Sequence, residues 1–156
     1  MRRKNELING GELLIGLIVR TLGATAVLHE LFHVAAALAF GLEVTEFTWT
    51  AVRIPGATVA VLAAGYFGEI VLWTTVALVA IRYRRRGAGF AIGHLVYVAL
   101  IWLVSSDRLG IPFPLRGFYD LLFIGFMVAA FRLVQYAVVY MRQEKSPPRP
   151  RRYLPH

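Results

Sequence analysis

The sequence has no cysteine and few acidic residues, and both shortages narrow what the protein can do. Without cysteine the chain can form neither disulfide bonds nor thiolate ligands, so a bound metal ion would be held by histidine and carboxylate. The 17 lysine and arginine residues outnumber the 9 acidic residues and give a net charge of +8. These basic residues gather at the ends of apolar runs, a pattern typical of membrane topology, so we expect no nucleic-acid partner.

Apolar residues dominate the composition. Hydrophobic residues make up 58% of the 156 residues and the mean hydropathy is +0.60, above what a soluble domain of this size needs for its core. The apolar runs cover residues 21–40 (with a shorter run before it at 13–19), 58–81, 89–105 and 118–141. At about 20 residues per crossing, the expected fold class is an all-α integral membrane protein with about four transmembrane helices in the lipid bilayer.

The basic clusters predict how these helices are oriented. Residues 2–4 and the run from Arg82 to Arg86 lie at ends of apolar runs, and the positive-inside rule then makes both termini cytoplasmic. Arg20 is expected to snorkel at the front of the first helix. We expect a membrane-embedded domain over residues 1–142 and a basic, Pro/Arg-rich cytoplasmic tail over 143–156. Cleavage as a signal peptide near Ala26 is disfavoured because it would shorten the first helix.

A short segment between the first two helices has a different pattern. Residues 43–53 are rich in β-favouring side chains, and Phe47 and Trp49 fall on one face at a period of two. One interpretation is an interfacial loop with Trp49 in the headgroup belt. The other is a β-like edge strand that could hold an extended peptide through main-chain hydrogen bonds.

The first long apolar run contains an H-E-x-x-H motif formed by His29, Glu30 and His33. On a helix, residues four apart share a face, so both imidazoles can reach one Zn²⁺ ion while Glu30 acts as general base on a water at the open position. Ionisable groups inside membrane segments are costly and usually serve a function. The pattern therefore favours a zinc hydrolase. The alternative is a polar cluster that only ties helices together.

The stretch His29-Glu30-Leu31-Phe32-His33-Val34-Ala35-Ala36-Ala37-Leu38-Ala39-Phe40-Gly41 resembles the first core helix of the site-2 protease family of intramembrane zinc metalloproteases. Phe32 stands where the family commonly has glycine. Ala64-Gly65-Tyr66-Phe67-Gly68-Glu69 is similar to the family's A-G-P-x-x-N element, with Glu69 in place of asparagine. The resemblance covers roughly residues 21–121 and implies a divergent, minimal member of that family.

The third zinc ligand departs from the family pattern. The family's N-x-x-P-x-x-x-L-D-G-like stretch is missing, and Pro112 to Gly117 looks like its remnant, with Arg116 near the expected aspartate. Asp107 is the favoured ligand because its surroundings look like an S-D motif followed by G-I-P in a divergent branch of the family. Asp120 is the alternative ligand, although it could serve only as a helix amino-terminal charge.

Two further ionisable residues lie within predicted helices. Glu69 is the third candidate ligand, and the resemblance implies that it would bind the substrate backbone or hydrogen-bond a zinc ligand; it could also pair with a buried arginine. His94 stands alone in the third helix, which favours a structural histidine. A proton relay through Glu69 and His94 in a small transporter has weaker support because the sequence has no inverted repeat.

The resemblance implies a zinc metalloendopeptidase that performs intramembrane proteolysis. Its substrates would be membrane proteins or peptides, and a zinc-activated water would hydrolyse the peptide bond. The alternative function is a non-catalytic membrane-embedded adaptor or binding protein that keeps the polar cluster for structure. The adaptor would tolerate Glu30→Gln, whereas the protease would not.

Overall fold

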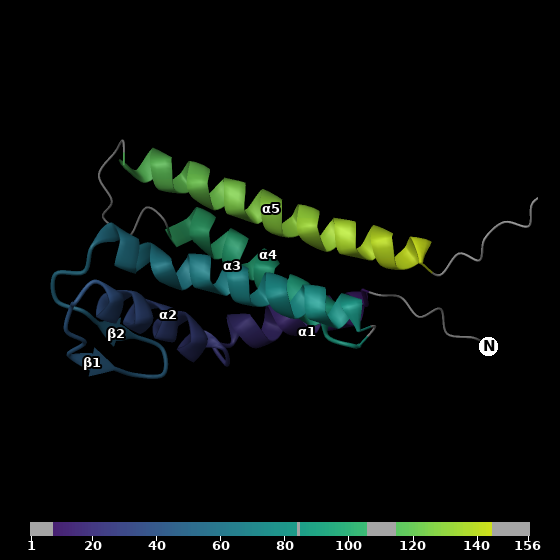
Figure 1. Ribbon diagram of the computed structural model, residues 1–156. Coiled ribbons are helices and arrows are strands. Elements are labelled where there is room, and N and C mark those ends of the chain that lie inside the picture. The colour runs from purple at the N-terminus through teal and green to yellow at the C-terminus, as the bar shows by residue number, and fades with distance from the viewer. Residues whose placement is uncertain (1–7, 84, 106–114, 145–156) are drawn as a thin grey trace, which may run out of the picture.

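The computed structural model describes residues 8–83, 85–105 and 115–144. Within these residues the chain is mostly helical, with one small antiparallel sheet of two strands (Figure 1). The elements are α1 (Gly10–Thr21), α2 (Ala26–Ala39), β1 (Glu46–Phe47), β2 (Val52–Arg53), α3 (Val59–Arg82), α4 (Ala88–Ser105) and α5 (Leu115–Gln143).

The helices form an elongated bundle in which α3 is central. α1 and α2 lie end to end along one side of α3, and α5 runs along the opposite side (Figure 1). α3 contacts α2, α4 and α5, while α1 packs mainly on α4. A core of buried apolar side chains from α3, α4 and α5 joins these helices, with Trp73, Leu95 and Met127 among its members. The elements that carry the H-E-x-x-H motif and Glu69, α2 and α3, therefore lie in direct contact.

The first predicted span is broken. A single helix over residues 21–40 was expected, but α1 and α2 meet at a bend of 63°, with Gly23 at a φ of +77° in the connection. Arg20 is not a snorkelling residue: its side chain is only 9% exposed and pairs with Glu69 of α3. The expectation was wrong because a buried carboxylate partner holds this arginine inside the bundle.

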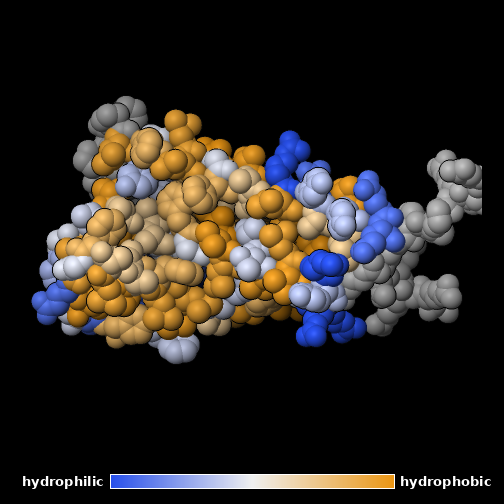
Figure 2. Space-filling view, viewed as in Figure 1, coloured by the Kyte–Doolittle hydropathy of each residue, from blue (hydrophilic) through white to orange (hydrophobic). Residues whose placement is uncertain are grey.

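Two helices are long enough and apolar enough to cross a membrane. α3 and α5 meet both criteria, and the bent pair of α1 and α2 would make a third span if it is counted as one. The apolar part of α4 is shorter, so the expected set of four spans is met only in part. Orange apolar surface covers most of the visible face, and hydrophilic residues gather toward one end (Figure 2). Large exposed side chains such as Leu121, Leu133 and Tyr136 lie on α5.

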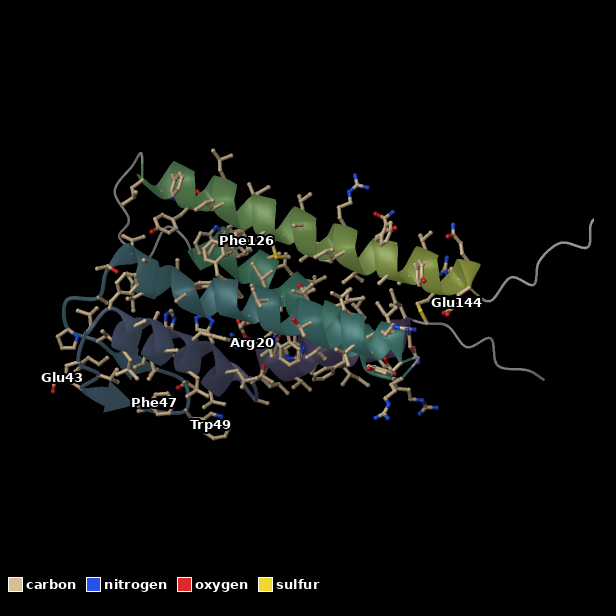
Figure 3. All side chains as sticks on the ribbon, viewed as in Figure 1. Arg20, Glu43, Phe47, Trp49, Phe126 and Glu144 are labelled. Atoms are coloured by element: carbon tan, nitrogen blue, oxygen red, sulfur yellow. The ribbon has the colours of Figure 1, made fainter. Side chains whose placement is uncertain are left out.

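The segment predicted to be β-like forms a hairpin. β1 and β2 pair antiparallel, with Glu46 opposite Arg53 and Phe47 opposite Val52. Phe47 and Trp49 are 46% and 64% exposed and point away from the helices (Figure 3). β2 contacts α2, so the hairpin lies against the helix that carries the H-E-x-x-H motif.

Candidate metal centre

The helix α2 presents His29 and His33 toward α3. The four-residue spacing puts both on one face, and their ring centroids lie 4.7 Å apart with the ring planes at 83°. His33 is buried, and the His29 side chain is 13% exposed. The two imidazoles expected to share a metal ion are therefore neighbours in the interior of the bundle.

Each ring has a hydrogen-bond acceptor at its Nδ1 atom. His33 Nδ1 lies 2.7 Å from the carbonyl oxygen of Val61, and His29 Nδ1 lies 3.1 Å from Oε2 of Glu69. A carbonyl or a carboxylate can only accept, so each Nδ1 carries the proton and donates it. In a neutral imidazole the other nitrogen, Nε2, then has a free lone pair, which is the form that binds metal.

The two Nε2 atoms converge on Gly65 of α3. A Cβ added at this glycine would lie 2.6 Å from Nε2 of His29 and 2.6 Å from Nε2 of His33. The two nitrogens are therefore separated by no more than twice that distance. A side chain at this position would occupy space within 2.6 Å of both nitrogens, so only glycine fits here. From the sequence alone Gly65 was only part of the resemblance, because the approach of the two rings depends on how the helices pack.

Glu30 faces the other side of the same region. Together with His33 it lines a cavity of about 420 Å³ whose other wall includes Val52, Arg53 and Ile54 of the hairpin. The Glu30 carboxylate accepts a hydrogen bond from the backbone N–H of Val52. The residue expected to act as general base thus lies in a cavity beside one imidazole and next to the main chain of β2.

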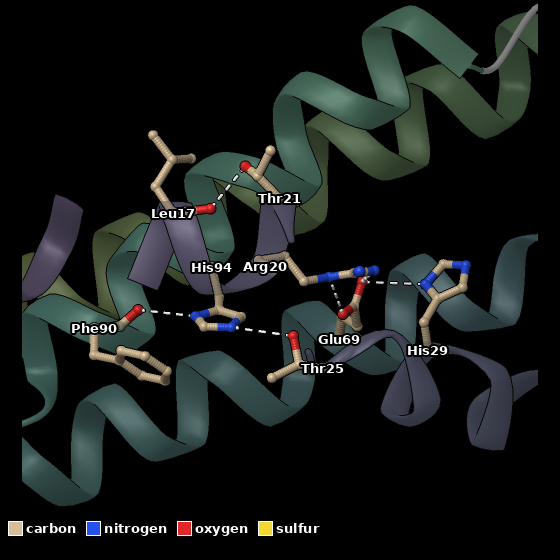
Figure 4. Close-up of polar contacts among 8 residues, drawn as sticks. All are labelled: Leu17, Arg20, Thr21, Thr25, His29, Glu69, Phe90 and His94. Carbon is tan, nitrogen blue, oxygen red and sulfur yellow. Dashed lines mark hydrogen bonds and ion pairs between the residues drawn. The ribbon is translucent and has the colours of Figure 1, made fainter. Parts of the chain in front are cut away.

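Glu69 links the imidazole of His29 to Arg20 of α1 (Figure 4). Its Oε1 lies 2.9 Å from Nε of Arg20, and its Oε2 accepts from Nη2 of Arg20 at 3.1 Å as well as from His29. Of the roles considered for Glu69, this geometry favours a hydrogen bond to a metal ligand and a pair with a buried arginine. The buried arginine proposed as a partner of Glu69 is Arg20, which was expected to snorkel instead. An arginine flanked by apolar runs is itself a signal of a buried partner.

Asp120, the alternative third ligand, lies apart from the imidazoles. It accepts a hydrogen bond from Nε1 of Trp102 at 2.9 Å and pairs with Arg116 at 3.6 Å. Tyr66 lies between, with its ring 4.7 Å from that of His29 and 5.1 Å from that of Trp102. Asp107, the favoured ligand, lies outside the described residues.

His29 and His33 could fill two of the ligand positions around one zinc ion. The described part of the chain holds no group of three His, Asp or Glu side chains placed around one ion. His29 and His33 nevertheless bring two imidazole nitrogens close to one glycine, and each ring is oriented by an acceptor at Nδ1. Imidazole nitrogen is a donor that zinc prefers when thiolates are absent. A third ligand would have to come from outside this described set or from a rearrangement of it.

His94 is itself fully buried and belongs to a separate cluster (Figure 4). Its Nδ1 donates to the carbonyl oxygen of Phe90 at 3.1 Å, and its Nε2 accepts from the hydroxyl of Thr25 at 3.2 Å. The ring stacks on Trp73 with centroids 3.9 Å apart. Both ring nitrogens are occupied, as a structural histidine requires.

Comparison with known proteins gives no matching family model, no similar curated protein and no similar solved structure.

Proposed function

We propose that this chain is an intramembrane zinc metalloprotease of the site-2 protease type, which hydrolyses peptide bonds of membrane-associated substrates. The observation that carries the proposal is the convergence of the Nε2 atoms of His29 and His33 on Gly65, with an acceptor bound to each Nδ1 atom. A cluster that served only to join helices would not need two histidines whose Nε2 atoms both approach one position that lacks a side chain.

His29 and His33 would hold the ion, with Asp107 as third ligand and Asp120 as the alternative. Bound Zn²⁺ would supply Lewis-acid polarisation of the scissile carbonyl and activation of a water. Glu30 takes the proton from that water and returns it to the nitrogen of the leaving amine, which completes hydrolysis without net proton change. Its place in the cavity beside His33 supports this role.

The hairpin suggests how a substrate is held. A helical peptide bond is shielded by its own hydrogen bonds, so the substrate must be extended before attack. β2 borders the cavity that contains Glu30, and its main chain at Val52 is directed at that carboxylate. An extended substrate segment that pairs along β2 would pass the general base.

The membrane arrangement belongs to the same proposal. Four crossings, made by the broken pair of α1 and α2 and by α3, α4 and α5, would put both termini on the cytoplasmic side. The exposed Arg82 and Arg142 lie in the last turns of α3 and α5, and these two helices end at the same end of the bundle, which supports this orientation (Figure 1).

A non-catalytic adaptor is the second candidate. The ion pair of Arg20 with Glu69 and its extension to His29 joins three helices, which a purely structural cluster would also do. The two functions differ at Glu30: its carboxylate lines the cavity beside the hairpin, so the protease needs it, whereas a cluster that only joins helices gains little from it.

Cleavage of an unfolded protein in detergent tests the proposal. Zinc-loaded wild type and Glu30→Gln are incubated with fluorescently labelled casein, and exposed Glu46→Gln is the matched control. We expect Glu30→Gln to keep its zinc and lose about 100-fold or more of the rate, with Glu46→Gln unchanged. Equal rates for wild type and Glu30→Gln would contradict the mechanism, and a zinc-loaded wild type that cleaves nothing would favour the adaptor.

A further inference from the structure

Arg20 reaches the candidate metal centre from a separate helix. It lies in the last turn of α1, 49 residues before Glu69 in the sequence, and its guanidinium makes two contacts with the Glu69 carboxylate, one to each oxygen. The side chains of Arg20 and Glu69 are 9% and 1% exposed. The Nη2–Oε2 contact is a hydrogen bond and the Nε–Oε1 contact is an ion pair at 2.9 Å, so the guanidinium holds the carboxylate beside it.

The carboxylate that Arg20 fixes is the one that orients His29. Glu69 Oε2 accepts from Arg20 and from His29 Nδ1, both at 3.1 Å. His29 offers a lone pair at Nε2, the ring nitrogen near Gly65, only while Nδ1 carries the proton. The orientation of the imidazole therefore depends on the position of one carboxylate oxygen, and that oxygen is held by Arg20.

Contacts between α1 and α4 fix the position of Arg20 along the axis of the bundle. A Cβ at Gly16 of α1 would lie 2.2 Å from the carbonyl oxygen of Phe90, and a Cβ at Gly93 of α4 would lie 2.2 Å from that of Leu13. The two backbones thus touch, as they do in small-residue helix contacts in membranes. The guanidinium also lies 5.0 Å over the ring of Tyr97 in α4.

We propose that Arg20 is a positioning residue for the metal ligand His29, acting through Glu69, and that the break between α1 and α2 exists to bring Arg20 to this carboxylate. This inference rests on the proposed metal centre. It assigns α1 a role in metal binding, although α1 carries no metal ligand.

The test separates ligand orientation from fold stability. Zn²⁺ affinity, by competition with a chromophoric chelator, and thermal stability in detergent are measured for wild type, Arg20→Met, Glu69→Leu and the double variant. Arg132→Met, which breaks an exposed contact with Gln135 on α5, is the control. Replacing a buried ion pair with two apolar side chains is commonly tolerated, whereas removing one partner is not.

We expect both single variants to lose stability and the double variant to regain it. Zinc affinity should nevertheless stay about 10- to 100-fold below wild type in the double variant, because the acceptor for His29 Nδ1 is still missing. Affinity that recovers together with stability would overturn the positioning role, since a merely structural pair behaves in that way. Arg132→Met should match wild type in both measurements.

Nitrogen NMR of histidine-labelled, metal-free protein provides a second readout. The His29 signals should report a protonated Nδ1 in wild type and a mixture of tautomers in the double variant; an unchanged tautomer would overturn the inference. Failure of the two proposals is distinguishable. A wild type that binds no zinc removes the proposed function, whereas zinc bound equally by wild type and double variant removes only the role of Arg20.

Discussion

Two histidine clusters lie in the same bundle, and they use the imidazole ring differently. His29 and His33 each have an acceptor at Nδ1, and both Nε2 atoms face the backbone of Gly65. His94 has partners at both ring nitrogens and stacks on Trp73. All three residues occur in apolar helices, so their helical setting alone does not separate them. The number of ring nitrogens that have a partner among the described residues does, and it separates the proposed ligand pair from the structural histidine.

Removal of the proposed third ligand should have the largest effect on zinc binding by the His29 and His33 cluster. We expect Asp107→Ala to lower the zinc content from about one ion per chain to near zero, because a catalytic site needs three protein ligands. Asp120→Ala should keep its zinc and lose about 1–3 kcal/mol of stability, since Nε1 of Trp102 loses its acceptor. Elemental analysis and thermal unfolding in detergent measure both. The opposite pattern would make Asp120 the ligand.

A methyl group at Gly65 should weaken zinc binding by His29 and His33 without removing a ligand. Gly65→Ala puts a carbon 2.6 Å from both Nε2 atoms, so we expect zinc affinity to fall at least tenfold, read by chelator competition. Gly125→Ala in α5 is the control, because its added carbon meets nothing within 4 Å. That control should be neutral or stabilising by about 0.5–1 kcal/mol. Unchanged affinity in Gly65→Ala would mean that the lone pairs do not meet a metal here.

A substitution of His94 tests whether the second histidine cluster serves only the stability of the fold. His94→Ala opens a space beside Trp73 and leaves the hydroxyl of Thr25 without its partner, so a loss of about 3 kcal/mol is expected. Zinc content should stay at the wild-type value. Thermal unfolding and elemental analysis of the same sample report the two quantities. Loss of zinc with an intact fold would contradict the division between the two clusters.

The smallest effect is expected at Thr25. Thr25→Val removes the group at Nε2 of His94 and should cost about 1 kcal/mol, the usual net value of one hydrogen bond, with zinc binding unchanged. Thr75→Val is the matched control, because its hydroxyl bonds only to the Val71 carbonyl of its own helix and the residue is exposed. Equal thermal midpoints for the two variants would mean that the His94 contact contributes nothing to stability.

Much of the helical framework could be predicted from the sequence. The apolar runs at 58–81, 89–105 and 118–141 correspond closely to α3, α4 and α5, because hydropathy is a local property that a helix displays along its length. The period-two segment after the first helix likewise forms the hairpin of β1 and β2. These elements carry their own signals in adjacent residues.

The remaining features depend on how the helices pack. Gly23 is a weak local signal of the bend of 63°, because the apolar character continues through residues 21–25. The pairing of Arg20 with Glu69 and the clearance at Gly65 join residues that lie far apart in the chain, so each becomes visible only when α1, α2 and α3 are assembled. The H-E-x-x-H motif was recognisable because its spacing is contained within one helix.

The zinc content of the detergent-purified protein tests the central claim most directly. Wild type, His29→Ala and His33→Ala are supplied with Zn²⁺, freed of excess metal and analysed for ions per chain. We expect about one ion in wild type and close to none in either variant. A wild type without zinc, or variants that retain as much zinc as wild type, would contradict a metal centre built on these two histidines.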